Sequence, residues 1–206
     1  MSDGYSKIDN TDDFLSFYPE WIASSQNNSF YGLNAFPFRL MSLGCTQALD
    51  EFHYWCQLKK RRVRMYRGEY PYNRDCTPFD WEQDFIEDRP LQRGDAVLIS
   101  LPFSGSGDVH PQWDELLAAC EKLEIPIFVD CAFFGTCGGV QVDLNHPNIL
   151  FVAFSTTKGL SCGSYRSGIL FSKEPGGHLS VQTQWHHGIH LNSSIGLYLM
   201  KNYSPD

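Results

Sequence analysis

The second half of the chain alternates continuous apolar runs with a helical pattern, and this alternation constrains the fold more than any other feature. Four short runs, Ala96–Ser100, Pro126–Val129, Ile149–Phe154 and Gly168–Phe171, are apolar along almost their whole length. Between the first two, Trp113–Leu123 places its apolar residues on one side of a helix. Apolar strands separated by helices are typical of a parallel sheet covered on both faces. We therefore predict an α/β fold, with a mostly parallel central sheet and helices on both faces.

Weaker patterns of the same two kinds occupy the rest of the chain. The expected elements are helices at Asp12–Ser24, Gln47–Lys60 and Ile195–Tyr203, and strands at Phe38–Leu43 and Val63–Tyr66. Residues 67–80 are rich in Tyr, Pro, Asn and Arg and are predicted to form a loop. We divide the chain into an N-terminal segment, residues 1–35, and one large domain, residues 36–206.

Composition excludes several classes of protein. The chain has 206 residues, 42% of them hydrophobic, which is enough for one substantial domain with a core. Its formal net charge of −8 argues against a nucleic-acid partner, since phosphate backbones need a basic face. No apolar run reaches membrane-spanning length, and the acidic start lacks the pattern of a signal peptide. The seven cysteines include no Cys-x-x-Cys, so we expect free thiols, a cytoplasmic location and no membrane partner.

Polar residues with chemical potential follow the predicted strands. Gly44-Cys45-Thr46 lies between a strand and a helix, where backbone N–H groups and the helix dipole can receive a phosphate. The glycine of such a turn also has a purely steric explanation, so the motif is weak by itself.

A carboxylate, a lysine and an arginine follow in order. Asp130 ends an apolar run, Lys158 lies in Ser155-Thr156-Thr157-Lys158-Gly159, and Arg166 comes eight residues later. Singly, they are explained as a helix cap, a solvated lysine and a surface arginine. Jointly, they match the needs of pyridoxal 5'-phosphate: a Schiff-base lysine, a partner for the phosphate and a carboxylate that keeps the pyridine nitrogen protonated. We therefore predict this cofactor and no metal.

From about Phe36 to the end, these segments resemble fold type I pyridoxal-phosphate enzymes, the aspartate aminotransferase superfamily. The resemblance implies that Lys158 forms the Schiff base and moves the proton at the α-carbon, and that Asp130 pairs with the pyridine nitrogen. It also implies an aromatic residue stacked on the ring, for which we favour Tyr72 over Tyr70. The full predicted set of cofactor-binding residues is Gly44, Cys45, Thr46, Tyr72, Ser104, Asp130, Phe133, Ser155, Thr157, Lys158 and Arg166.

Two positions depart from the family pattern. Ser104-Gly105-Ser106-Gly107 replaces an Asn-Pro-x-Gly segment whose asparagine bonds the phenolic oxygen of the cofactor, which leaves Ser104 as a shorter substitute. Phe133 replaces a tyrosine that bonds the same oxygen. We expect both changes to alter the proton affinity of the lysine-bound cofactor without preventing cofactor binding.

The resemblance implies an aminotransferase that moves an amino group between an amino acid and a 2-keto acid and works as a homodimer. Family members continue past the lysine with a small domain that grips the substrate carboxylate, so we expect this chain, which ends at Asp206, to be a fragment. A lyase or decarboxylase on the same scaffold is an alternative, because the core residues do not choose which α-carbon bond breaks. A non-catalytic homologue with a role in binding or assembly is another. A nicotinamide-binding domain ranks last, since Gly-x-Gly-x-x-Gly is absent.

Two further motifs have structural explanations. The basic run Lys59–Arg64 resembles a nuclear-targeting or nucleic-acid patch, but cations are also favoured where a helix ends. His186-His187-Gly188-Ile189-His190 lacks a fourth metal ligand, and its glycine interrupts the spacing.

Overall fold

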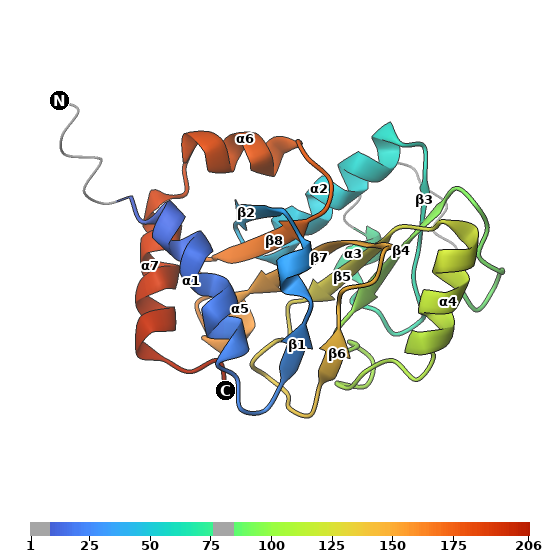
Figure 1. Cartoon of the computed structure of the whole chain (residues 1–206), viewed down its shortest axis with the longest axis horizontal. Helices are drawn as coiled ribbons and strands as arrows, with labels where there is room; N and C mark the ends of the chain where they lie inside the picture. Colours follow the sequence, from blue (N-terminus) through green and yellow to red (C-terminus); the bar gives the residue numbers. More distant parts are fainter. Residues whose placement is uncertain (1–8, 76–84) are drawn as a thin grey trace.

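A computed structural model describes residues 9–75 and 85–206. Its centre is a six-stranded sheet in the order β2-β8-β7-β5-β4-β3 (Figure 1). The strands are β2 Phe38–Ser42, β3 Arg62–Arg64, β4 Asp95–Ser100, β5 Ile127–Cys131, β7 Ile149–Ser155 and β8 Gly168–Ser172. Only β8 runs antiparallel to its neighbours, β7 and β2. The prediction of an α/β fold with a mostly parallel sheet is confirmed.

The connection between β7 and β8 lacks the helix that usually carries a chain back across a sheet to a parallel neighbour. Parallel neighbours are joined by a crossover that is usually built around a full helix. Here residues 156–167 contain only the four-residue helix α5, Thr156–Gly159, and then turn back along the sheet. As a consequence, the end of β7 and the start of β8 lie at the same edge of the sheet, which brings α5 and the residues before Gly168 together.

Helices cover both faces of the sheet. They are α1 Thr11–Ala23, α2 Cys45–Leu58, α3 Tyr72–Asp75, α4 Trp113–Leu123, α6 His178–Trp185 and α7 His190–Asn202. Side chains of α1, α4 and α7 belong to one buried cluster and those of α2 and α6 to the other. Alternate residues of β5 point into each, Ile127 and Val129 into the first and Phe128 into the second, as a strand buried on both faces requires.

The N-terminal residues pack into the same core as the sheet. In Figure 1, α1 lies beside α7 at one side of the molecule, and Phe14, Tyr18 and Trp21 of α1 are buried in the first cluster. Strand β1, Ser29–Tyr31, pairs in parallel with β6, Gln141–Asp143, and the 3₁₀ turn η1, Leu33–Ala35, follows β1. These short elements were not predicted, because three residues are too few to show a periodicity.

Most predicted elements are confirmed within one or two residues. Trp113–Leu123 is α4 as predicted, and α2 begins at Cys45 rather than Gln47. The strand predicted at Val63–Tyr66 ends earlier, at Arg64. The loop predicted at residues 67–80 contains the single turn α3, and its residues from 76 onward lie outside the described part.

Within the ranges that the structure describes, no helix combines the length and apolar character needed to cross a bilayer. The six cysteines in those ranges are all free.

Candidate functional site

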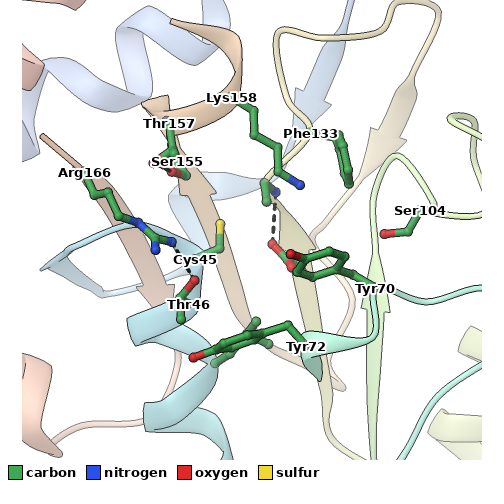
Figure 2. Close-up of a pocket in the computed structure, with 13 residues that line it drawn as sticks. Cys45, Thr46, Tyr70, Tyr72, Ser104, Phe133, Ser155, Thr157, Lys158 and Arg166 are labelled. Carbon is green, nitrogen blue, oxygen red and sulfur yellow. Dashed lines mark hydrogen bonds between the residues drawn. The ribbon is translucent and has the colours of Figure 1, made fainter. Parts of the chain in front are cut away.

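A cavity of about 220 Å³ opens beyond the carboxyl ends of β4, β5 and β7. Parallel strands deliver their following residues to one edge, where ligands of such sheets bind. Every predicted cofactor-binding residue except Gly44 lines this cavity, together with Leu49, Tyr70 and Ala132 (Figure 2). Residues far apart in the sequence, such as Thr46 and Arg166, which are separated by 120 positions, therefore share one site.

Gly44 lies behind the wall of the cavity and is needed there. Its φ is +84°, a conformation that side chains with a Cβ disfavour. A Cβ would also lie 3.1 Å from the Ser155 hydroxyl oxygen and 3.2 Å from an Arg166 nitrogen. The steric explanation of this glycine therefore holds, and the space it leaves lets Ser155 and Arg166 approach the start of α2.

One side of the cavity gathers hydrogen-bond donors. Arg166 donates from Nη2 to the Thr46 hydroxyl at 2.6 Å. Ser155 caps α5: its oxygen accepts from the Thr157 N–H at 3.1 Å, and its hydroxyl contacts the Thr157 oxygen at 2.7 Å. Among the described residues, the buried Nε of Arg166 has no hydrogen-bond partner. A guanidinium with an unused donor, two or more hydroxyls and the N-terminus of α2 form a site suited to a dianionic phosphate.

Asp130 lies deep in the cavity, with its side chain 6% exposed. Its Oδ1 accepts from the Ala132 N–H at 3.0 Å, and its carboxylate also accepts from the Cys45 thiol. Burial raises the pKa of Asp130, while the Cys45 and Ala132 hydrogen bonds and the charge of Lys158 act against that rise. The residues after Asp130 form turns rather than a helix, so it is no helix cap.

Lys158 extends from α5 over two aromatic rings. Its Nζ lies 3.3 Å from the centre of the Phe133 ring and 5.2 Å from that of Tyr70. Partial burial lowers the pKa of Lys158, and Arg166 lowers it further, whereas Asp130 opposes this. An amine with a lowered pKa is more often unprotonated and so is a better nucleophile.

Two tyrosines close the cavity on the side of α3. Tyr70 and Tyr72 stack with ring centres 6.4 Å apart and planes 18° from parallel. Both line the cavity, and the Tyr70 ring lies below the Lys158 amine. The choice between them as the residue stacked on the ring stays a prediction.

A buried carboxyl group next to the cavity was missed by the sequence analysis. Glu69 is 8% exposed and accepts from Ser100 twice, from N–H at 2.7 Å and from the hydroxyl at 2.6 Å. The Ser100 hydroxyl in turn lies 3.0 Å from the hydroxyl of Ser104, on the cavity wall. A glutamate in a polar, proline-containing segment is expected to be exposed, and only its position beside Tyr70 hinted at more.

The histidine motif does not join the site. His186 and His190 both contact the carboxylate of Asp9, which precedes α1, and thereby connect the start of α1 to the end of α6 and the start of α7. Among the described residues, no group of three or more His, Cys, Asp or Glu side chains is placed to hold a metal ion.

No protein-family model and no curated protein sequence matches the chain. Several solved structures, however, are similar to the chain. A probable N-succinyldiaminopimelate aminotransferase from Thermus thermophilus matches 94% of this chain and 58% of its own, with a TM-score of 0.63 and 14% identity. A PLP-bound C–S lyase from Staphylococcus hominis matches 93% of this chain and 55% of its own, with a TM-score of 0.65 and 11% identity.

A tyrosine aminotransferase from Leishmania infantum is similar over 94% of this chain and 59% of its own, with a TM-score of 0.63 and 13% identity. The chain thus spans less than two thirds of the length of the solved structures it matches. The fold implied by the motifs is confirmed by these matches. The chain has the α/β fold that these aminotransferases and this C–S lyase share.

Proposed function

We propose that the chain is the pyridoxal-phosphate-binding part of an enzyme that transfers an amino group between an amino acid and a 2-keto acid. The observation that carries the proposal is the meeting of Lys158, Asp130 and Arg166 in one cavity. Each meets a different need of the cofactor, and three separate segments of the chain supply them.

The residues present fit the cofactor. Its phosphate matches the donors of Arg166, Thr46 and Ser155, including the unused Arg166 Nε. Thr157 and the backbone N–H groups of Cys45 and Thr46 would complete that set. The contact between Tyr70 and Lys158 supports Tyr70 as the stacking residue, in preference to our sequence-based choice of Tyr72.

In this mechanism Lys158 has two tasks. Its amine would hold the cofactor aldehyde covalently and, when a substrate amine displaces it, would carry the proton at the substrate α-carbon. When bound, the cofactor supplies an electron sink for the electron pair released at that carbon. Asp130, as a buried anion, would keep a proton on the ring nitrogen, and Arg166 would fix the phosphate so that the ring stays in place.

The choice of reaction depends on groups that orient the substrate. Transamination is our proposal because most of the similar structures described above are aminotransferases. The similar C–S lyase supports a lyase as the second candidate, since the same core residues serve whichever α-carbon bond breaks. We further propose that substrate binding uses the part of the enzyme that this chain does not span, and that two copies form the working unit.

The test is the visible absorbance of the purified protein with added pyridoxal phosphate, followed by borohydride reduction and peptide mass spectrometry. We expect an imine band and a modified Lys158, both lost in Lys158→Ala. Lys173→Ala is the matched control, because burial also lowers the pKa of Lys173 and its Nζ lies over a ring, Phe36, but outside the cavity. A band that survives Lys158→Ala, or no band at all, would overturn the proposal.

Amino-group transfer needs a second assay, with an amino acid and a 2-keto acid, on a version of the protein that includes the remaining part of the enzyme. Transfer of the amino group supports the aminotransferase; elimination products support the lyase. Cofactor binding without turnover would support a non-catalytic homologue.

A further inference from the structure

Three side chains connect a buried carboxyl group to the cavity wall. Glu69 Oε2 lies 2.6 Å from the Ser100 hydroxyl, and that hydroxyl lies 3.0 Å from the Ser104 hydroxyl. The Ser104 N–H also donates to the Ser100 oxygen, at 2.8 Å. Ser104 lines the cavity, whereas Ser100 is buried in β4 directly beside Asp130 of β5.

When Glu69 is ionised, the number of available protons determines which way the hydrogen bonds between Glu69, Ser100 and Ser104 run. A carboxylate only accepts, so Ser100 must donate its single hydroxyl proton to Glu69. The two lone pairs of the Ser100 oxygen then accept from the Ser104 N–H and the Ser104 hydroxyl. The Ser104 hydroxyl therefore donates its only proton to Ser100, and toward the cavity it can only accept a hydrogen bond.

Protonation of Glu69 reverses the donor and acceptor roles in this row of hydrogen bonds. The carboxyl O–H now donates to Ser100, whose lone pairs are filled by Glu69 and by the Ser104 N–H. Ser100 therefore donates its own proton to the Ser104 oxygen. The Ser104 hydroxyl is then free to donate into the cavity, without movement of any heavy atom.

We propose that Glu69 is a positioning residue that sets, through Ser100, whether Ser104 donates or accepts a hydrogen bond in the cavity. An anionic oxygen of a ligand is held by Ser104 only in the donating state. The inference rests on the proposed function, because the anionic oxygen we assign to this position is the phenolic oxygen of pyridoxal phosphate. The proposal implies that Glu69 takes up one proton when that oxygen binds.

The surroundings of Glu69 bring its pKa close to neutral pH. Burial, and then the charge of Asp130, raise the pKa of Glu69 to about 7, against the hydrogen bonds from Ser100 and Tyr70. Asp130 on β5 is the charged group that faces it, and Lys158 of α5 lies over the ring of the adjacent Tyr70. Small changes of pH around neutrality, or the arrival of an anionic oxygen, are therefore enough to change its protonation.

The first experiment uses the free protein. Glutamate labelled with ¹³C at the carboxyl carbon is titrated by NMR, and Glu69→Gln assigns the signal. We expect one carboxyl group to titrate near neutral pH and its midpoint to rise in Ser100→Ala, because the ionised form loses a donor. A Glu69 that stays ionised down to acidic pH, or a midpoint unchanged in Ser100→Ala, would overturn the proposal.

The second experiment measures the Kd of pyridoxine 5'-phosphate, which keeps the phenolic oxygen but lacks the aldehyde and so cannot react with Lys158. Above the Glu69 midpoint, one proton is taken up with each ligand, so Kd should rise by up to about tenfold per pH unit. Glu69→Gln keeps an acceptor for the Ser100 N–H and a permanent donor for its hydroxyl. This variant should bind as the wild type does at low pH, and the Glu69 component of the pH slope should vanish.

Ser104→Ala should also lose that component, and it should bind more weakly than Glu69→Gln at every pH. The matched control is Glu124→Gln, which removes an exposed carboxylate paired with Arg93 and should keep the wild-type slope. A slope retained in Glu69→Gln or in Ser104→Ala would refute the switch. If the ligand binds to none of the proteins, the proposed function fails, while the NMR titration still decides whether Glu69 and Ser100 exchange the proton as proposed.

Discussion

Two buried aspartates of the same sheet should respond in opposite ways to loss of their charge. Asp95, 1% exposed, forms ion pairs with Arg64 at 2.8 Å and with Arg62 at 3.1 Å. Asp130, 6% exposed, has no ion pair within the described part of the structure and accepts only from Ala132 and Cys45. We predict that Asp95→Asn destabilises the free protein and that Asp130→Asn stabilises it at neutral pH.

The magnitudes follow from what each carboxylate loses. Asp95→Asn leaves the fully buried Arg64 without its carboxylate, and breaking such a pair costs about 3–5 kcal/mol. Asp130→Asn keeps the oxygen that accepts from Ala132 and removes a buried charge. Each unit by which burial raises the Asp130 pKa corresponds to about 1.4 kcal/mol of native-state cost above that pKa. The free energy of unfolding of Asp130→Asn should therefore exceed that of the wild type at neutral pH, in proportion to that rise.

The direction of the Asp130 pKa shift determines how the stability difference between the two proteins changes with pH. Because the folded pKa of Asp130 is raised above its unfolded value, the native state binds the extra proton. The wild type then loses stability as pH rises from the unfolded to the folded pKa, and Asp130→Asn does not. Its advantage in urea unfolding should be present at neutral pH and should shrink on acidification.

Pyridoxal phosphate is added in the second half of the assay. Asp130→Asn should then bind the cofactor more weakly than the wild type, although it is the more stable protein without it. Destabilisation by Asp130→Asn at all pH values would mean that this carboxylate is structural, and the argument from its burial would be refuted.

Three shorter predictions concern the cavity wall. Gly44→Ala should cost about 1–3 kcal/mol from its backbone conformation, with φ +84° and ψ 177°, and more from contact with Ser155 and Arg166. Gly139→Ala, also at positive φ but in open space, should show only a conformational cost in urea unfolding. Arg166→Lys should weaken pyridoxal-phosphate binding by about 1.5–3 kcal/mol, because an ammonium cannot form the paired contacts of a guanidinium; equal Kd values by titration would contradict this. Phe133→Tyr adds a hydroxyl donor beside Lys158, so the pH midpoint of the Lys158-dependent absorbance should fall; an unchanged midpoint would mean that the hydroxyl does not reach the cofactor oxygen.

The cavity residues were predictable because topology brings them together. Asp130 and Ser155 lie at the ends of β5 and β7, and Thr46 lies just after β2. Strands that run in the same direction end at the same edge of the sheet, whatever their distance in sequence. The antiparallel direction of β8 was not predictable from its apolar composition. It follows from the turns of residues 156–167, which bring Arg166 back to the same edge.

Glu69 shows where sequence reasoning ends. Its neighbours Gly68, Tyr70 and Pro71 are typical of an exposed loop, and a glutamate there is expected to face water. Its burial depends on Ser100, 31 residues away, which supplies two donors from the end of β4. A non-local pairing of this kind leaves no periodic signal, whereas an amphipathic helix such as α4 carries its pattern in consecutive residues.

The arrangement of charges separates groups that serve the fold from groups that await a ligand. Asp95 and the arginines around it satisfy one another, so folding alone accounts for them. Asp130, Lys158 and the Nε of Arg166 are different: burial opposes the charge of the first two, and the third lacks a partner among the described residues. Buried polar groups left in this state cost stability, and a ligand that bears a phosphate, a basic ring nitrogen and an aldehyde removes all three costs when it binds. The meeting of these three groups in one cavity of about 220 Å³ therefore supports our proposal of a ligand of this chemistry.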